Sequence, residues 1–285
     1  RDSVSIRHGG VHIGQGNEIG GLSLCAVGNQ TIVEHVETFA QQDDGIDIFG
    51  GTVNLSNVIT VSAGDDGIDT DYGYSGTISN FIVYDANDAS MELDGPEATD
   101  LGLGNHLLKR GTVFTLSGRE LCDMDADSNT DVDSIYWFGL NPGDYSLKTF
   151  TEIPFPVVPA SLSNLEATIP AGESITDYFL NGSDQYVTDV PLGTQTVGAN
   201  ICAFTSWTAF DLAGMIATNF VVNPMGCNDQ SASNYCSYGA SQANCSYDTL
   251  SPCQASVGLF EAHTKGDQDI KLFPLPANDQ LQVSL

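Results

Sequence analysis

The feature that most constrains the fold is a repeat of about 22 residues. The pentapeptide DDGID occurs at 43–47 and again at 65–69. Three consecutive segments share one design: 31–51, 52–73 and 77–95. Each begins with Thr and a β-branched residue, alternates apolar positions, reaches an acidic turn and closes on Gly. The acidic turns start at Asp43, Asp65 and Asn87, 22 residues apart each time. A fixed period of this length is typical of solenoids.

Two solenoid architectures have repeats of this length. Leucine-rich repeats need recurrent Leu and an Asn ladder, and the sequence shows neither. A parallel β-helix needs short β-branched strands joined by turns rich in Gly, Asn and Asp, and this pattern is met. Glycine is frequent, at 30 residues, while long amphipathic helical patterns are scarce. We therefore predict an all-β parallel β-helix with coils of about 22 residues, whose apolar rows stack into a continuous core.

Stacked coils would place the acidic turns in rows, about 4.8 Å apart from one coil to the next. The three rows are Asp43, Asp65 and Asn87; Asp44, Asp66 and Asp88; and Asp47 and Asp69, continued by Glu92 with a one-residue slip. Like charges one coil apart repel, and each carboxylate is costly unless it is paired, solvated or neutralised. Almost no Lys or Arg is near these turns in the sequence. Another group must therefore offset the cost.

The net charge of the chain excludes two classes of partner. The 37 acidic and 8 basic residues give a net charge of −29, which would repel nucleic acid and anionic membrane surfaces. The same charge favours divalent cations. With 41% hydrophobic residues, the chain still has material for a sizeable core. No apolar run reaches the roughly 20 residues that span a bilayer, so we predict neither a nucleic-acid partner nor membrane insertion.

The regularity of the repeat declines after Gly95. Runs typical of strands at 111–117 and 133–139 predict further, less regular coils, whereas 145–222 is irregular. Within it, 206–217 is predicted to form a short amphipathic helix. Because the end coils of a solenoid need covering, we expect this helix to cap the open end.

Seven cysteines are present, and four of them lie close together near the end of the chain. These four are Cys227, Cys236, Cys245 and Cys253. Their density suits disulfides in an exported protein, and the absence of CxxC spacing argues against zinc. The pairing stays open, and the odd total leaves at least one thiol unpaired unless a bridge joins two chains.

Several stretches resemble a group of secreted β-helical proteins that is common in Bacteroidetes. They are NEIGGLSLCAVGNQTIVEHVETFAQQDDGIDIFGGTVN, GDDGIDTDYGYSG, MELDGPE and GANICAFTSWTAFDLAG. The resemblance covers roughly residues 7–217 and is strongest at 17–76. It implies export and a right-handed parallel β-helix.

Two further resemblances lie downstream. GCNDQSASNYCSYGASQANCSYDT (226–249) resembles a small Cys-bearing module of large surface proteins from the same bacteria, with Cys227 and Cys245 on its two usual cysteines. DIKLFPLPANDQLQVSL (269–285) resembles the start of the C-terminal sorting domain of the type IX secretion system, with Leu275 in place of the hallmark Asn. These modules imply the type IX secretion machinery as a partner and a secreted or cell-surface location. The implied domains are a β-helix at 1–222, a disulfide module at 223–254, a linker at 255–266 and a truncated sorting domain at 267–285.

Three interpretations of the acidic turns compete. In the first, Asp and Asn side chains accept local hydrogen bonds in tight turns, and Gly45 and Gly67 supply positive φ. In the second, rows of carboxylates share calcium ions between coils, since Ca²⁺ takes six to eight oxygen ligands. The predicted ligands are Asp43, Asp44, Asp47, Asp65, Asp66, Asp69, Asp88 and Glu92. A second acid-rich segment, 123–133, is a further calcium candidate.

The third interpretation of the acidic turns is catalysis. DDGID followed by GDD is similar to the acid motifs of polygalacturonase-type glycoside hydrolases, which implies Asp44, Asp65 and Asp66 as catalytic acids. The later Gly-His-Gly and Arg-x-Lys elements of that family are absent downstream. DDGID also recurs in one context, as repeats do and active sites do not.

Aromatic residues offer a possible sugar-binding face, because aromatic rings stack on sugars. The candidates are Tyr72, Tyr74, Tyr84, Trp137 and Phe138, with strand packing as the alternative for each. The sequence thus predicts non-enzymatic adhesion or glycan binding, with calcium in the acidic turns. The alternative is a polysaccharide-degrading hydrolase or lyase that uses the three acids of the polygalacturonase-like motif.

Overall fold

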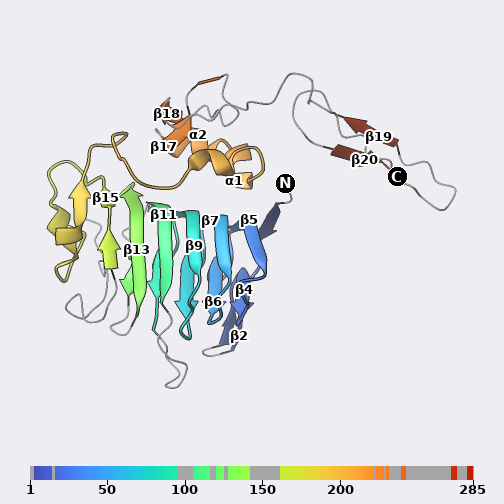
Figure 1. Ribbon diagram of the computed structural model, residues 1–285, viewed down its shortest axis with the longest axis horizontal. Coiled ribbons are helices and arrows are strands. Elements are labelled where there is room, and N and C mark those ends of the chain that lie inside the picture. Colours follow the sequence, from blue (N-terminus) through green and yellow to red (C-terminus); the bar gives the residue numbers. More distant parts are fainter. Residues whose placement is uncertain are drawn as a thin grey trace. The chain divides into compact units, whose positions relative to one another are not determined.

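The computed structural model describes the following residues: 3–14, 17–95, 105–115, 120–124, 128–141, 161–220, 223–227, 229–230, 239–241, 271–274 and 281–284. The chain divides into two units, Arg1–Tyr247 and Asp248–Leu285. The first unit contains a solenoid (Figure 1). The second contains an antiparallel pair of strands, β19 (Lys271–Pro274) and β20 (Leu281–Ser284).

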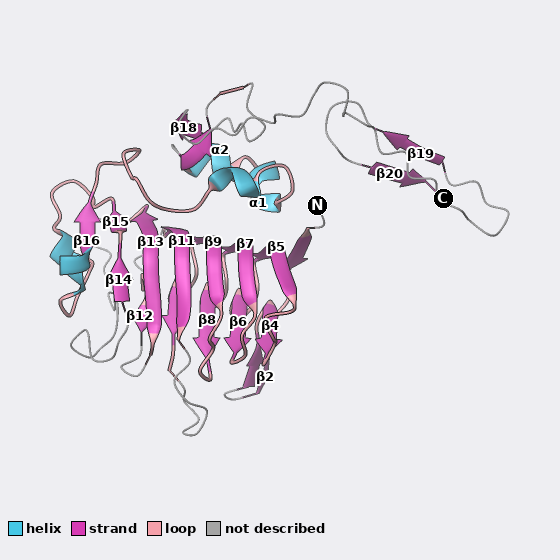
Figure 2. Ribbon diagram, in the orientation of Figure 1, coloured by secondary structure: helices cyan, strands magenta, loops and turns pink. Residues whose placement is uncertain are grey.

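Two parallel sheets form the solenoid (Figures 1 and 2). In spatial order, the long sheet consists of β1 (Val4–Arg7), β5 (Ile32–Phe39), β7 (Asn54–Val61), β9 (Thr77–Tyr84), β11 (His106–Phe114), β13 (Thr130–Phe138), β15 (Leu165–Ala167) and β16 (Val187–Asp189), with β14 (Ser161–Ser163) also beside β13. The short sheet consists of β12 (Asp123–Met124), β10 (Met91–Leu93), β8 (Ile68–Asp71), β6 (Ile46–Phe49) and β4 (Leu22–Cys25). From β4 to β13 the chain alternates between the sheets, so each turn of the solenoid adds one strand to each, whereas the described strands β14, β15 and β16 extend only the long sheet.

This topology confirms the predicted all-β parallel β-helix. Equivalent residues of neighbouring coils are 22 or 23 residues apart. Asp44 and Asp66, in the acidic turns, are 22 apart, and Asn57 and Asn80, in the long strands, are 23 apart. Strands β11 and β13 confirm that further coils follow Gly95. Among the described residues, no helix is long and apolar enough to cross a membrane.

Each long strand bends at one residue with positive φ. The bend residues are His35, Asn57, Asn80, Arg110 and Ser134. Asn is favoured in this left-handed conformation, and here its amides also link the coils. Nδ2 of Asn80 donates to Oδ1 of Asn57 at 2.6 Å, and Nδ2 of Asn57 lies 3.4 Å from Nε2 of His35. A short Asn ladder therefore exists, although the sequence showed none.

The core lies between the two sheets. Alternation along β6 and β8 points Ile46, Ile48 and Ile68 inward, where they are fully buried. One polar network interrupts this core. Nε2 of His106 lies 3.1 Å from Oγ1 of Thr70 and 3.0 Å from Oγ1 of Thr130. Burial lowers the pKa of His106 to about 4.

A helical segment covers the outer side of the long sheet. It follows two short 3₁₀ helices, η1 (Ile175–Asp177) and η2 (Ser183–Tyr186), and contains η3 (Ile201–Phe204), α1 (Ala209–Leu212) and α2 (Met215–Asn219). We call residues 199–220 the strap. Its apolar side chains pack on outward residues of β7, β9, β11 and β13: Ile59, Val61, Ile82, Tyr84, Phe114, Tyr136 and Phe138.

The strap confirms helix within 206–217 but corrects its predicted position. Phe210 and Ile216 pack on the side of the coils, not over an open end. The reason is the second half of each long strand, which presents large apolar residues on both faces. The interior buries one set, and the strap must bury the other.

The remaining elements are two small strand pairs. β2 (Val11–Gly14) and β3 (Asn17–Ile19) form an antiparallel hairpin. β17 (Asn223–Cys227) and β18 (Gly239–Ser241) pair in parallel. Most of the predicted disulfide module and sorting domain lies outside the described residues, including the cysteines Cys236, Cys245 and Cys253.

Three described cysteines lie outside the predicted group of four. Cys202, in η3, is disulfide-bonded, whereas Cys25 and Cys122 are free thiols. A disulfide at Cys202 was not predicted, because that residue stands far from the cluster in the sequence.

Candidate metal centre

The outer face of the short sheet carries a row of acids. The register sets Asp47 beside Asp69, Asp69 beside Glu92, and Glu92 beside Asp123. The one-residue slip expected at Glu92 is absorbed in the turn before β10. Alternation along β8 adds Asp71 to the same face, two residues after Asp69.

The turns that precede these strands carry a second row of acids. Oδ1 of Asp44 accepts from the backbone N of Asp66 at 2.9 Å, and Oδ1 of Asp66 accepts from the backbone N of Ala89 at 2.5 Å. Ala89 therefore takes the third place in this row. Asp88 is exposed and lies outside it, because the third turn is one residue longer.

The glycines of DDGID serve a purpose that differs from the predicted one. Neither Gly45 nor Gly67 has positive φ. A Cβ at Gly45 would lie 2.6 Å from the carbonyl oxygen of Gly67, and a Cβ at Gly67 would lie 2.6 Å from that of Ser90. Glycine is needed there because the backbones of successive coils approach too closely for a side chain.

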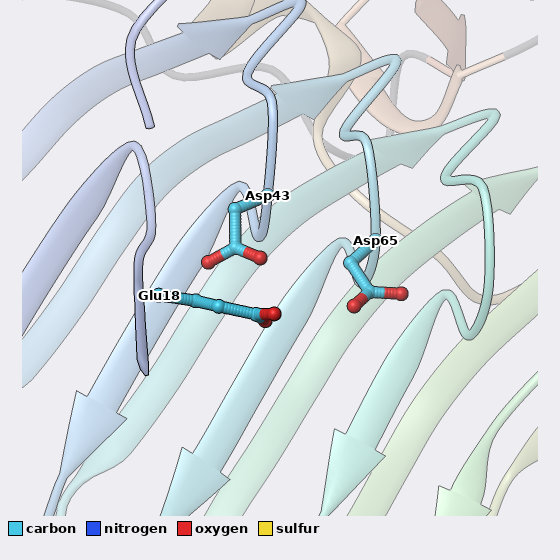
Figure 3. A group of neighbouring side chains, drawn as sticks. All are labelled: Glu18, Asp43 and Asp65. Atoms are coloured by element: carbon cyan, nitrogen blue, oxygen red, sulfur yellow. The ribbon is translucent and has the colours of Figure 1, made fainter. Parts of the chain in front are cut away.

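Within these turns and strands, the acids converge into three groups. In each group, one carboxylate oxygen of every residue lies within 4.8 Å of the others. The groups are Glu18, Asp43 and Asp65 (Figure 3); Asp44, Asp47 and Asp69; and Asp44, Asp65 and Asp66. Ca²⁺ binds oxygen at 2.3–2.6 Å, so two ligands of one ion lie no further apart than about 5 Å. Each group is compact enough to share one ion.

Several carboxylate oxygens in these groups are buried without a hydrogen-bond partner. They are Oδ1 of Asp43, Asp47 and Asp69. The three side chains are 2%, 3% and 8% exposed. The other oxygen of Asp47 accepts a bond from Oγ of Ser23 at 3.3 Å. A buried polar atom without a partner costs about 1–3 kcal/mol, and more when it is charged, so these oxygens require a further partner.

The pKa values of the acids also show that their charged forms are unfavourable at these buried positions. Burial, followed by neighbouring carboxylates such as Asp71, raises the pKa of Asp69 to about 11. Burial is also the main cause that raises the pKa of Asp44 to about 8 and of Asp47 to about 7. Two negative charges 4.8 Å apart repel by roughly 3 kcal/mol at an effective dielectric constant of about 20. At neutral pH, the group must hold protons or a cation.

Two pairs of acids are hydrogen-bonded in this arrangement, and a bond between two carboxyl groups requires a proton. Asp43 is hydrogen-bonded to Glu18, and Asp66 is hydrogen-bonded to Glu92. Burial, followed by these carboxyl partners, raises the pKa of both Asp43 and Asp66. The charged groups that contribute most to these shifts are all carboxylates. A cation could therefore replace the shared protons.

The group of Asp44, Asp65 and Asp66 bears on the catalytic alternative. Their oxygens lie within 4.8 Å of one another. Inverting glycosidases hold their two carboxyl groups about 6.5–9.5 Å apart, and retaining ones about 5–5.5 Å. Oxygens this close are nearer together than the carboxyl groups of an inverting enzyme, which must leave room for a water, and they are compatible with a retaining pair or with a shared ion.

Two acids of this region, Glu18 and Asp71, were not predicted as ligands, and for a third, Asp123 of the predicted segment 123–133, the place in the row was missed. Glu18 lies before the repeats, on β3, and no periodic signal marks it. Asp123 joins the row through β12, but the irregular spacing after Gly95 hides its register with Glu92. Asp71 could have been found, because alternation within DGIDTD sets it on the same face as Asp69.

The predicted sugar-binding face is largely absent. Tyr74, Tyr84, Trp137 and Phe138 are buried and pack in the core or under the strap. Tyr72 is 39% exposed. It follows Asp71 directly, and its ring centroid lies 5.8 Å from that of Phe49, the neighbour of Asp71 across β6 and β8. One aromatic pair therefore borders the acidic face.

The comparisons with known proteins agree with this architecture. Residues 3–115 match a family model described as a pectate-lyase-like β-helix domain. No curated protein and no solved structure matches the chain. The match covers the coils that carry the acidic groups. Together with the two parallel sheets, it defines the class: this is a parallel β-helix protein.

Proposed function

We propose that the chain is an exported β-helix protein that binds glycans without cleaving them, with calcium held in its acidic turns. One observation carries the proposal. Asp47 and Asp69 each have one buried oxygen without a hydrogen-bond partner, and both residues belong to a compact group of carboxylates on the outer face of the short sheet. Such an arrangement is stabilised by a cation, and the charged neighbours that act most strongly on it are acids.

Calcium fits this donor set better than other common ions. All ligands are carboxylate oxygens, which suit hard cations such as Ca²⁺ and Mg²⁺. Mg²⁺ demands near-ideal octahedral geometry at 2.0–2.1 Å, whereas Ca²⁺ accepts irregular sets. Asp44, Asp47 and Asp69 would hold the ion, and water would complete its coordination. The ion would supply positive charge and open ligand positions on an otherwise acidic face.

The glycan would lie on the same face. Tyr72 and Phe49 offer an aromatic surface beside Asp71, and sugar rings stack on such surfaces. Hydroxyl or carboxylate groups of the glycan would take the open positions on the calcium ion. At a net charge of −29, an acidic glycan would approach only where the ion offsets repulsion.

Export rests on the resemblances in the sequence and on one further observation. The sorting-domain resemblance at 267–285 supports passage through the type IX secretion machinery to the medium or the cell surface. Structural disulfides persist in oxidising compartments, and Cys202 is disulfide-bonded.

A second candidate function is cleavage of a polysaccharide by Asp44, Asp65 and Asp66. The observation that favours it is the match of residues 3–115 to a family named for pectate lyases. The three acids do converge, at a spacing closer than that of inverting glycosidases.

One experiment separates the two functions. The purified chain is tested for retention on immobilised glycans, acidic polysaccharides such as polygalacturonate included, in millimolar calcium and in EDTA. The same solutions are then analysed for shortened products. We expect calcium-dependent retention that Tyr72→Ala weakens at least tenfold and Asp88→Asn leaves unchanged, with no products. Shortened products that Asp66→Asn abolishes would establish the enzyme instead.

A further inference from the structure

We propose that Glu18, Asp43 and Asp65 form a second divalent-cation site, which fastens the β2–β3 hairpin onto the acidic turns. This site deepens the proposed calcium binding, but it uses none of the ligands Asp44, Asp47 and Asp69. It joins a segment that precedes the repeats to two successive coils.

The β2–β3 hairpin has few other means of attachment. Its strands pair only with each other among the described strands. The apolar side chains of Val11, Ile13 and Ile19 are exposed, so they contribute little to holding it. Backbone hydrogen bonds anchor the chain on either side of the hairpin: Gln42 N donates to the carbonyl oxygen of Gly9 at 2.9 Å, and Gly21 N donates to that of Asp44 at 2.8 Å.

Between these anchors, Glu18 reaches the acidic turns. Figure 3 shows its side chain extending from β3 toward the space between Asp43 and Asp65. One oxygen from each residue lies within 4.8 Å of the others. Asp43 is 2% exposed, and its Oδ1 has no hydrogen-bond partner. The buried, unpartnered oxygen distinguishes this group from an ordinary cluster of surface acids, because that oxygen has no access to water.

The charges decide whether this contact attracts or repels. Three ionised carboxylates would push β3 away from the turns. A divalent cation removes the repulsion and binds all three groups at once. Because Glu18 is exposed, water can complete the coordination sphere, and the ion can exchange with solvent.

The consequence is a hairpin whose attachment depends on calcium. In calcium, β3 should lie on the acidic turns. Without calcium at pH 8, the same three acids should release it. The second site would thus expose or cover the turns of Asp43 and Asp65 in response to calcium concentration.

Two measurements on the full chain test this proposal. Calorimetric titration with calcium chloride counts the bound ions, and hydrogen exchange reports the amides of the hairpin. At pH 8 we expect two ions per chain in the wild type and one in Glu18→Gln. Calcium should slow exchange of the hairpin amides at least tenfold in the wild type and leave it unchanged in Glu18→Gln. Asp88→Asn, an exposed acid outside the groups, should behave like the wild type.

The variant Asp47→Asn/Asp69→Asn separates this site from the first. It should bind one ion and still show calcium-dependent protection of the hairpin. If Glu18→Gln also shows calcium-dependent protection of the hairpin, the second site is disproved. The loss of one bound ion in Asp47→Asn/Asp69→Asn would still support the first site. Equal exchange of the wild-type hairpin in calcium and in EDTA would also overturn the proposal.

Discussion

Buried acids on the outer faces of the two sheets differ in whether the chain supplies their hydrogen-bond partners. On the long sheet, Glu37 is fully buried and accepts bonds from Oγ of Ser5 at 2.5 Å, Ala209 N at 2.9 Å and Phe210 N at 3.0 Å. On the short sheet, Asp69 is almost as buried, but its Oδ1 has no partner. Both residues project outward from strands of the same solenoid.

The difference lies in which buried acids receive hydrogen-bond donors from the chain itself. The strap returns over the long sheet and presents the first amides of α1 to Glu37, so this acid is satisfied internally. No described segment brings donors to the unpartnered oxygens of Asp47 and Asp69. An acid whose partners come from the chain is structural, and an acid left without them points to a ligand.

The largest expected effect is a pH dependence confined to the acidic face. The pKa values of Asp47 and Asp44, about 7 and 8, lie above the unfolded value near 3.9. Their stabilising contribution is therefore present below pH 4 and lost as pH rises through 7 and 8. Each proton retained by the native state changes the free energy of unfolding by about 1.4 kcal/mol per pH unit.

His106 opposes this trend over a lower pH window. Its pKa of about 4 lies below the usual 6.5, so its contribution is present above pH 6.5 and lost as pH falls toward 4. The clearest window is thus pH 6.5 to 8. In EDTA, we expect urea unfolding to show a loss of about 4 kcal/mol across it, because Asp69, with a pKa of about 11, keeps its proton throughout the window, Asp44 over most of it and Asp47 over a smaller part. Stability that rises with pH in this window would contradict the account of the acidic face.

The next largest effect is expected on the strap. Glu37→Ala removes the acceptor of Ala209 N and Phe210 N and leaves both amides without a partner. We expect a loss of about 3 kcal/mol in the free energy of unfolding, measured by urea denaturation, in calcium and in EDTA alike. Glu34→Ala, at an exposed position of the same strand, should change stability by less than about 0.5 kcal/mol. A small effect of Glu37→Ala would mean that the strap does not depend on this acid.

The smallest effect is expected at the Asn ladder, which joins the strap to the bends of the long sheet. Asn80 donates to Asn57 and accepts from the backbone N of Asn200 at 2.5 Å. Asn80→Ala loses both bonds at a residue with φ 55°, and we expect a loss of about 2 kcal/mol. Asn54→Ala removes an exposed bond to Thr77 N and should cost less than about 1 kcal/mol. Equal losses of stability for Asn80→Ala and Asn54→Ala, in thermal or urea unfolding, would show that the Asn ladder does not stabilise the fold.

Only some residues of the acidic face could be placed from the sequence, for physical reasons. Asp47 and Asp69 could be aligned because two coils have the same length, and a period is visible without structure. Asp88 could not be placed, because one extra residue in its turn moved Ala89 into the row. Glu18 could not be found, since its proximity to Asp43 depends on how a hairpin outside the repeat returns to the coils.

The strap was harder to predict than the acidic face. Its helices could be recognised from local pattern, but the surface they cover could not. Ile59 and Phe114 face outward on strands whose other side is also apolar, and a continuous apolar run does not reveal which residues face which way. The partners of Glu37 come from 172 and 173 residues away, a distance that no local signal spans.

The most direct test of the central claim is the free energy of unfolding at pH 8 for the wild type and Asp47→Asn/Asp69→Asn, each in EDTA and in calcium. At 100 times the dissociation constant of each site, calcium should stabilise the wild type by about 2.7 kcal/mol per occupied site. The double variant should keep only the calcium shift of the second site, yet be more stable than the wild type in EDTA, because a buried amide needs neither a proton nor a cation. Asp88→Asn should match the wild type in both. An equal calcium shift in the double variant, or lower stability than the wild type in EDTA, would contradict the claim that these buried acids await a cation.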